Sequence, residues 1–415
     1  MVRIKPFAAL RPQKAYVEEV AARPYDVLNS KEAKAEAGEK SLLHITKPEI
    51  DFEPMIDEHS QAAYDKAVAN FKLWQENEWL VRDKKPYYYI YAQTMGDRTQ
   101  YGIMLCAHIE DYENGSIKKH ELTLKVKEDD RMIHVRAQNA NIEPVFFSCV
   151  DYPRINEIIF SVIKAEPEYD FYAEDGMGHH FWVIDDESLI SEITNIFTKY
   201  DSLYVADGHH RTAAAVRVGA EKRAQNPHHT SEEEYNYFMA VVFPESQLKI
   251  MDYNRVVKDL NGLGVEDFLS SLSDDFFIKK INESEEINPK CLHNFSMYLD
   301  GNWYSLQLKE GRSNDNDPLE VLDVSVLSNL VLDKVLGIRD LRTDKRIDFV
   351  GGIRGLSELK SRVDSGEMAV AFSLFPVSMR QLIDIADSGA IMPPKTTWFE
   401  PKLRSGLAIH LLGDS

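Results

Sequence analysis

The chain has 415 residues, which is enough for a large core divided among two or three lobes. Its 68 Asp and Glu residues outnumber its 48 Lys and Arg residues, so the formal net charge is −20 and the surface as a whole should repel duplex DNA. Three cysteines are too few and too scattered for a disulfide framework or a cysteine zinc cluster. We therefore expect no nucleic-acid partner and a reducing, cytoplasmic location.

No stretch of the sequence predicts a membrane segment. The longest apolar-rich run, MAVAFSLFPVSM, falls well short of the roughly 20 residues that a spanning helix needs. The N-terminus, MVRIKPFAALRP, has no hydrophobic block behind its basic residues, so we expect no signal peptide.

Strand and helix signals alternate along the chain, which predicts a mixed α/β, or α+β, fold class. Residues 87–109 predict two strands around a Gly-Asp turn, and residues 292–308 predict a hairpin with Asp300 and Gly301 at its tip. Apolar residues at helical spacing predict helices at 155–163 and 189–200, on either side of a hairpin-like stretch, FYAEDGMGHHFWVI. Nearer the C-terminus, the segments IDFVG and MAVAFSLF predict strands, and GLSELKSRV and SMRQLIDIADSG predict helices.

The stretch VADGHHRTAAA, residues 205–215, carries the strongest chemical signal. Its apolar start predicts a short strand, and the good helix formers from His209 to about Gln225 predict a helix, with Gly208 at the turn between them. The free N–H groups of a first helical turn attract anions, and the guanidinium of Arg211 matches phosphate geometry. With the histidines as further donors, the stretch predicts a phosphate cradle.

Asp207 does not suit a pure anion cradle, because a carboxylate repels phosphate. Its presence favours phosphoryl transfer, in which it would hold Mg²⁺ against the phosphates or accept the proton of an attacking hydroxyl. Two alternatives stay open: Asp207 caps the helix while the histidines are structural, or the histidines bind zinc. Adjacent histidines at a helix start point in different directions, which disfavours zinc.

The tract ADGHHR followed by small residues resembles the signature of the ParB/sulfiredoxin-like fold, and its Asp-Gly-His-His-Arg form resembles the free serine kinases of that superfamily. The chain as a whole resembles the domain-of-unknown-function ten-fifteen family. Blocks in one order carry this resemblance, namely VRIKPFAALRP, RPYDVLNS, LLHITKPEI, IKKHELTLKVKEDDR, GHHFWVIDD, VADGHHRTAAA and MPPKTTWFEPKLRSG.

The resemblance implies a ParB/sulfiredoxin-like core over residues 1–250 and a C-terminal α/β lobe over 251–415 that packs back on the core. It also implies kinase chemistry on free L-serine, giving O-phosphoserine, with ATP, ADP or pyrophosphate as the donor and Mg²⁺ as the cofactor. The residues that it places at the donor phosphates are Gly208, His209, His210, Arg211 and Thr212. Asp207 falls at an acidic active-site position and is the expected metal ligand.

Other candidate residues come from the remaining blocks. The serine kinases use an upstream glutamate as base, and we assign this role to Glu121, just before a strand-like run, with a solvated turn glutamate as the alternative. We expect His120, His180, Lys395 and Arg404 to bind substrate, although His180 equally suits packing and the C-terminal segment equally suits a closing strand. His44 is expected to be a core residue of an apolar strand.

These inferences predict a small-molecule kinase, and an oligomer is compatible with the sequence. The alternative, from a different class, is a nucleotide-binding switch like ParB without kinase activity. Sulfiredoxin chemistry is disfavoured, since no cysteine stands at the histidine positions of the tract.

Overall fold

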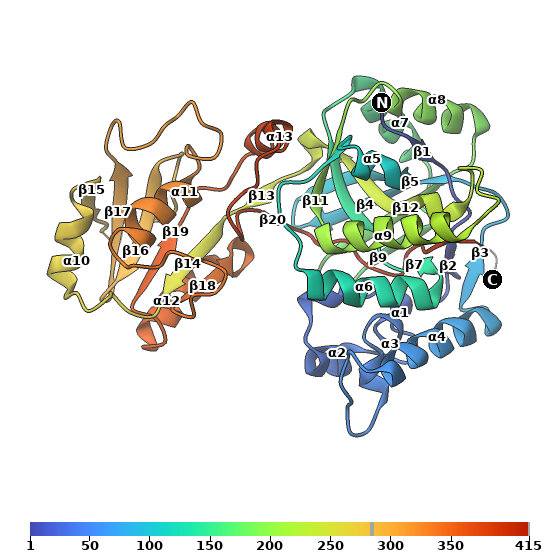
Figure 1. Ribbon diagram of the computed structural model, residues 1–415, viewed down its shortest axis with the longest axis horizontal. Helices are drawn as coiled ribbons and strands as arrows, with labels where there is room; N and C mark the ends of the chain where they lie inside the picture. Colours follow the sequence, from blue (N-terminus) through green and yellow to red (C-terminus); the bar gives the residue numbers. More distant parts are fainter. Residues whose placement is uncertain (283–285, 414–415) are drawn as a thin grey trace. The chain divides into compact units, whose positions relative to one another are not determined.

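The computed structural model describes residues 1–282 and 286–413, and these form two compact units (Figure 1). The first unit comprises Met1–Leu248 and Pro401–Ser415, and the second comprises Lys249–Glu400. The sequence-based division places the boundary at residue 250 and keeps residues 401–415 in the second lobe, whereas in the structure this last segment belongs to the first unit. None of the helices in the described part of the chain has the length and apolar content to cross a bilayer.

A mixed sheet of nine strands is the centre of the first unit within the described residues, in the order β6-β11-β8-β12-β5-β4-β10-β9, with β1 paired to β5. Its strands are β1 (Ile4–Lys5), β4 (Tyr88–Met95), β5 (Arg98–His108), β6 (Ile117–Lys118), β8 (Val145–Cys149), β9 (Tyr169–Tyr172), β10 (Gly178–Ile184), β11 (Leu203–Asp207) and β12 (Tyr237–Pro244).

Helices and two short strand pairs complete the first unit. The helices are α1 (Val17–Val20), α2 (Ser30–Glu36), α3 (Leu43–Thr46), α4 (Gln61–Glu76), α5 (Ile109–Glu113), α6 (Lys125–Gln138), α7 (Pro153–Val162), α8 (Glu187–Phe197) and α9 (His209–Gln225), with 3₁₀ turns η1 (Tyr25–Val27), η2 (Pro48–Asp51), η3 (Glu234–Asn236) and η4 (Glu245–Gln247). The strand pairs are β2 (Leu10–Pro12) with β3 (Leu80–Arg82) and β7 (Ala140–Asn141) with β21 (His410–Leu411).

Aromatic and branched residues in the central strands are buried on both faces of the sheet, which explains why these strands read as nearly continuous apolar runs. Helix α9 packs on β8 and β12 and lies alongside α6, as Figure 1 shows. Its alanines 213–215 are buried, and such small side chains allow a helix to approach its neighbours closely.

The second unit contains a six-stranded sheet in the order β15-β17-β16-β19-β14-β18 and the pair β13–β20. Its elements are β13 (Ile250–Met251), β14 (Tyr253–Val257), α10 (Val265–Leu272), β15 (Phe276–Lys280), β16 (Asn294–Leu299), β17 (Asn302–Leu308), α11 (Asp323–Leu327), the π-helix η5 (Ser328–Asp333), β18 (Ile347–Gly351), η6 (Gly352–Arg354), α12 (Gly355–Asp364), β19 (Val370–Ser373), α13 (Met379–Ser388) and β20 (Trp398–Phe399).

These sheets and helices confirm the predicted mixed α/β class, and they confirm the predicted hairpins at Gly96-Asp97 and Asp300-Gly301. Two local predictions are wrong. His44 lies in helix α3 rather than in a strand, with Nε2 2.9 Å from the Gly38 carbonyl and Nδ1 against the Asp51 carboxylate. The strand-like run after Glu121 becomes a loop and then helix α6.

Candidate functional site

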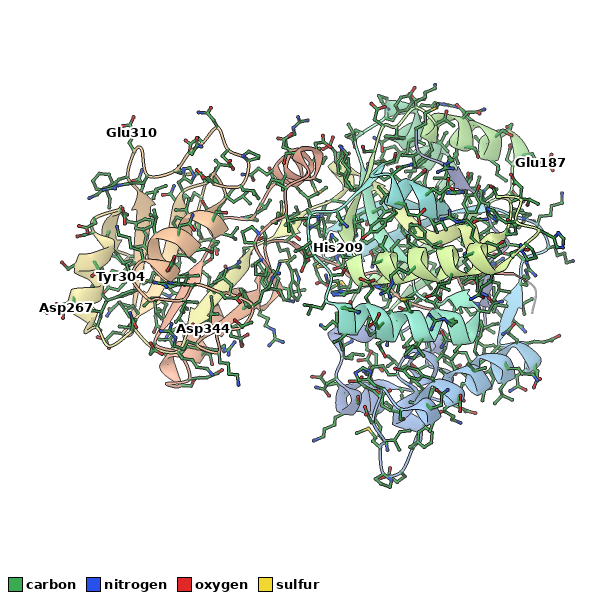
Figure 2. All side chains as sticks on the ribbon, in the orientation of Figure 1. Glu187, His209, Asp267, Tyr304, Glu310 and Asp344 are labelled. Carbon is green, nitrogen blue, oxygen red and sulfur yellow. The ribbon has the colours of Figure 1, made fainter. Side chains whose placement is uncertain are left out.

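Strand β11 passes into helix α9 through a single glycine. The strand ends at Asp207, the helix begins at His209, and Gly208 between them has φ 86° and ψ 32°. A side chain at this position would be strained, and its Cβ would lie 3.2 Å from Nε of Arg211. The predicted strand–glycine–helix arrangement is confirmed, and Figure 2 marks His209 at the start of the helix.

Several chain segments meet at the edge of the sheet where β11 ends. Because β6 runs parallel to β11, the loop 119–124 leaves from the same edge, and the antiparallel β8 begins there. Two hydrogen bonds join these segments to α9: the Leu124 N–H donates to Nε2 of His210 at 2.9 Å, and Nη1 of Arg211 donates to the Pro144 carbonyl at 2.8 Å. Ligands of open α/β sheets bind outside the carboxyl ends of strands, which makes this edge the candidate site.

Asp207 lies between two cationic side chains. Nζ of Lys402 donates to its Oδ1 at 2.8 Å, and Nη2 of Arg211 donates to its Oδ2 at 3.1 Å. Burial raises the pKa of this carboxyl, but the charges of Lys402 and Arg211 outweigh burial and hold the pKa at about 2. Asp207 is therefore an ionised carboxylate with both oxygens engaged by cations.

This arrangement does not fit the predicted magnesium site. A metal ion would have to displace Lys402 or Arg211 from Asp207. Within residues 1–282 and 286–413, no group of three or more His, Cys, Asp or Glu side chains is placed to hold a metal ion. Asp207 acts in this structure as the counter-ion of two cations rather than as a metal ligand.

Arg211 and Thr212 are less accessible than the phosphate cradle requires. Arg211 is only 8% exposed and lines a small cavity of about 40 Å³, not an open cleft. Thr212 is fully buried, and its hydroxyl donates to the Gly208 carbonyl at 3.0 Å, one helical turn back. The burial comes from packing of α9 against the sheet, which the local sequence does not reveal. Arg211 therefore secures Asp207 and Pro144 instead of facing solvent.

The histidines of the site are buried or used as acceptors. The rings of His120 and His209 meet edge to face with their centres 4.6 Å apart. Burial lowers the pKa of both rings, that of His120 to about 4, so both are neutral near pH 7. His210 accepts from the backbone of the loop through Nε2, which places its proton on Nδ1.

Comparison with protein families places this chain. Residues 4–325 match the family described as "Protein of unknown function (DUF1015)". The chain belongs to this family. Comparison with curated proteins finds no match.

Solved structures similar to this DUF1015 chain include a free serine kinase in complex with AMP, with 11% identity over 74% of this chain and 91% of that chain and a TM-score of 0.37. SbnI with a C-terminal truncation from Staphylococcus aureus has 11% identity, coverages of 74% and 87%, and a TM-score of 0.38. A conserved hypothetical protein from Pyrococcus furiosus has 14% identity, coverages of 75% and 95%, and a TM-score of 0.36.

Two of the other predicted residues lie beside the site in the DUF1015 chain. His120 and Glu121 both belong to the loop 119–124, which the His210 hydrogen bond ties to the start of α9. Glu121 is half-buried at the beginning of this loop. The structure thus brings the predicted base and the first helical turn of α9 to one edge of the sheet.

The remaining predicted ligands have structural partners of their own. His180, on β10, has Nδ1 2.7 Å from Asp170 and Nε2 2.9 Å from Thr94. Arg404 is 7% exposed, donates through Nε to Nε2 of His179 at 3.1 Å, and pairs with Asp175. Lys395 is exposed and lies in the second unit, so its predicted role in substrate binding stays a prediction.

The sequence does not place two charged residues of the site beside Asp207. Lys402 stands in the block MPPKTTWFEPKLRSG, in which we expected Lys395 and Arg404 to bind substrate. Asp26 stands in the block RPYDVLNS, and its Oδ2 lies 3.7 Å from Nη2 of Arg211 with the side chain 38% exposed. Since both blocks are distant in sequence from Asp207, no spacing rule links them to it.

Proposed function

We propose that this chain is a small-molecule phosphotransferase that binds the phosphates of its donor where β11 passes into α9. The observation that carries the proposal is Asp207 between Lys402 and Arg211 at the N-terminal end of a helix of 17 residues. An anion at this end of α9 gains from the helix dipole and from free first-turn N–H groups. Lys402 forms an ion pair with Asp207, and 18% of its side chain is exposed. It is therefore the cation best placed to turn toward a bound anion.

The acceptor in this proposal is the hydroxyl of free L-serine, and O-phosphoserine is the product. The choice of serine rests on the resemblance of the tract ADGHHR to the free serine kinases. In the transfer, the serine oxygen forms a bond to the terminal phosphorus, the bond from that phosphorus to the donor's bridging oxygen breaks, and a carboxylate takes the hydroxyl proton.

We propose a proton acceptor other than Asp207. A carboxylate with a pKa of about 2 is a weak base, so Asp207 is better suited to hold Lys402 than to accept a proton. Asp26 is more exposed and lies near one cation, at 3.7 Å from Arg211. We assign the role of base to Asp26, with Glu121 in the adjoining loop as the alternative.

Phosphorus NMR of the purified protein tests the proposal. L-Serine is incubated with ATP, ADP or pyrophosphate, each with and without Mg²⁺, beside glycerol and other small hydroxyl compounds. We expect one donor to give a phosphomonoester resonance that matches O-phosphoserine. Asp26→Asn should lower turnover about a hundredfold or more at similar donor affinity, in the range that general bases contribute.

Asp201→Asn is the matched control, because Asp201 is exposed and lies before β11. It should leave turnover unchanged. Nucleotide binding without any phosphorylated product would instead support the alternative of a nucleotide-binding switch. If no donor gives phosphoserine, whether or not nucleotide binds, the serine kinase proposal is contradicted.

A further inference from the structure

The second unit contains a cavity of about 570 Å³ that the proposed function does not use. One part of its wall comes from α11 and the π-helix η5, and another from the loop 338–342 and from residues 391–394 at the start of the block MPPKTTWFEPKLRSG. Cavities of 300 to about 1,000 Å³ with an apolar wall and a few polar groups are typical small-molecule sites. The volume is therefore that of a binding site rather than of a packing defect.

The wall offers charged and polar groups to a ligand. Arg342 and Glu320 both line the cavity with exposed side chains, and neither side chain makes a hydrogen bond or an ion pair within residues 1–282 and 286–413, although the charge of Arg342 acts on the carboxylate of Asp340, which also lines the cavity. The side chains of Ser325 and Asn329 likewise make no hydrogen bond there. A guanidinium and a carboxylate in one cavity complement a ligand that carries both signs of charge.

The π-helix shapes this wall. Residues Ser328–Asp333 form η5 directly after α11, and Ser328, Asn329 and Asp333 all line the cavity. π-Helical turns are rare and frequently occur at functional sites. The apolar residues of the lining are Leu319, Ile338, Leu341, Ile391, Met392, Pro393 and Pro394.

A buried cation lies behind the proline part of the wall. Arg255 on β14 is fully buried, and its Nη2 donates to the Pro394 carbonyl at 3.3 Å. No carboxylate of the described residues pairs with it, and its Nε has no hydrogen-bond partner. Burial lowers the pKa of Arg255 to about 10. The guanidinium lies 5.1 Å from the centre of the Phe349 ring, and because it has no carboxylate partner it favours negative charge nearby.

We propose that this cavity binds a small zwitterion of the amino-acid class with an apolar side chain. Its carboxylate pairs with Arg342 and is favoured by Arg255 behind the wall, and its ammonium group pairs with Glu320. The apolar side chain packs against the lining from Ile391 to Pro394. This site lies wholly within the second unit and does not depend on phosphotransfer by the first.

Titration calorimetry of the full chain tests the proposal in the absence of any phosphate donor. The probes are L-leucine and L-phenylalanine, with 4-methylpentanoate as the analogue of leucine that lacks the amine and isopentylamine as the analogue that lacks the carboxylate. We expect saturable binding of at least one amino acid and at least tenfold weaker binding of both analogues. Binding of either analogue as tightly as leucine would overturn the proposal, as would the absence of binding by both amino acids.

Two exposed arginines of the second unit make a matched pair of variants. Arg342→Gln should weaken amino-acid binding tenfold or more, and Glu320→Gln should weaken it similarly. Arg354→Gln, at a side chain that is 68% exposed outside the cavity lining, should leave the affinity unchanged. Equal affinities for Arg342→Gln and the unmodified protein, with circular dichroism showing both folded, would overturn the assignment of this cavity.

Discussion

Nζ of Lys402 lies 2.8 Å from Oδ1 of Asp207, although the two residues are 195 positions apart in the chain. The segment that carries Lys402 is tied to the first unit nearby, since the Lys402 carbonyl accepts from Gln93 and the Ser405 hydroxyl donates to Glu143. This ion pair joins the last residues of the chain to the turn between β11 and α9.

Lys402→Met should destabilise the protein by about 2 kcal/mol at pH 7, because it removes one of two cations from a mostly buried carboxylate. The folded-state pKa of Asp207 is about 2 against an ordinary value of 3.8. A carboxyl whose pKa is lowered by folding stabilises the folded protein at any pH above its pKa in the unfolded chain. This stabilisation is lost as the pH falls from about 4 through 2. Urea unfolding at pH 7 and pH 3 should therefore show a larger difference between the two proteins at pH 7.

The control for this experiment is Lys72→Met, at a side chain that is 77% exposed on α4. Its free energy of unfolding should stay within about 0.5 kcal/mol of the unmodified protein, as for most surface substitutions. A Lys402→Met protein as stable as this control would mean that the ion pair contributes nothing to the fold.

Arg211→Ala should cost about 3 to 5 kcal/mol of the free energy of unfolding, because it leaves Asp207 without its second cation and the Pro144 carbonyl without its donor. Arg217→Ala on the same helix removes an arginine that is 41% exposed and should cost less than about 1 kcal/mol. Denaturant titration of both variants measures the difference. Equal losses in the free energy of unfolding would show that the burial of Arg211 gives it no larger contribution to stability than that of Arg217.

Gly208→Ala should destabilise the protein by more than Gly115→Ala. Both glycines have φ near +80°, so both substitutions carry the backbone strain of about 1 kcal/mol. At Gly208, the new Cβ would also lie 3.2 Å from Nε of Arg211, whereas nothing lies within 4 Å at Gly115. Thermal unfolding of the two variants should separate the effect of backbone strain from that of displacing Arg211. Equal decreases in the unfolding temperature would mean that Arg211 can move without destabilising the protein.

His120→Gln should reduce the loss of stability on acidification. Burial holds the pKa of His120 at about 4 in the folded protein, against 6.5 for an ordinary histidine. The unfolded chain therefore binds a proton first, so this residue lowers the stability by about 2 kcal/mol between pH 7 and pH 5. Urea unfolding at both pH values should show a smaller difference for the variant.

For this last experiment, His228→Gln is the control, because His228 is exposed in the loop after α9. It should leave the change between pH 7 and pH 5 as it is in the unmodified protein. If His120→Gln also leaves that change in stability as it is, then the pKa of His120 in the folded protein is close to that of an ordinary histidine.

Local sequence determined the parts of this protein that depend on neighbouring residues. The turn at Gly208 could be predicted because a glycine between an apolar run and a run of helix formers allows few other conformations. The hairpin at Asp300-Gly301 could be predicted for the same reason. Prediction failed at His44 and after Glu121, where short apolar runs suit strand and helix equally and packing decided for helix or loop.

Only the tertiary structure decided which charges meet. The local pattern singled out Asp207 and Arg211 as candidate site residues, but whether Asp207 would face a metal ion or Lys402 depended on where the chain returns after residue 400. Burial decided the rest, because packing of α9 on the sheet enclosed Arg211 and Thr212, which sequence alone placed at an open helix end. Spacing along the chain carries no information about such contacts, since they arise from sheet order and from the packing of segments that are distant in sequence.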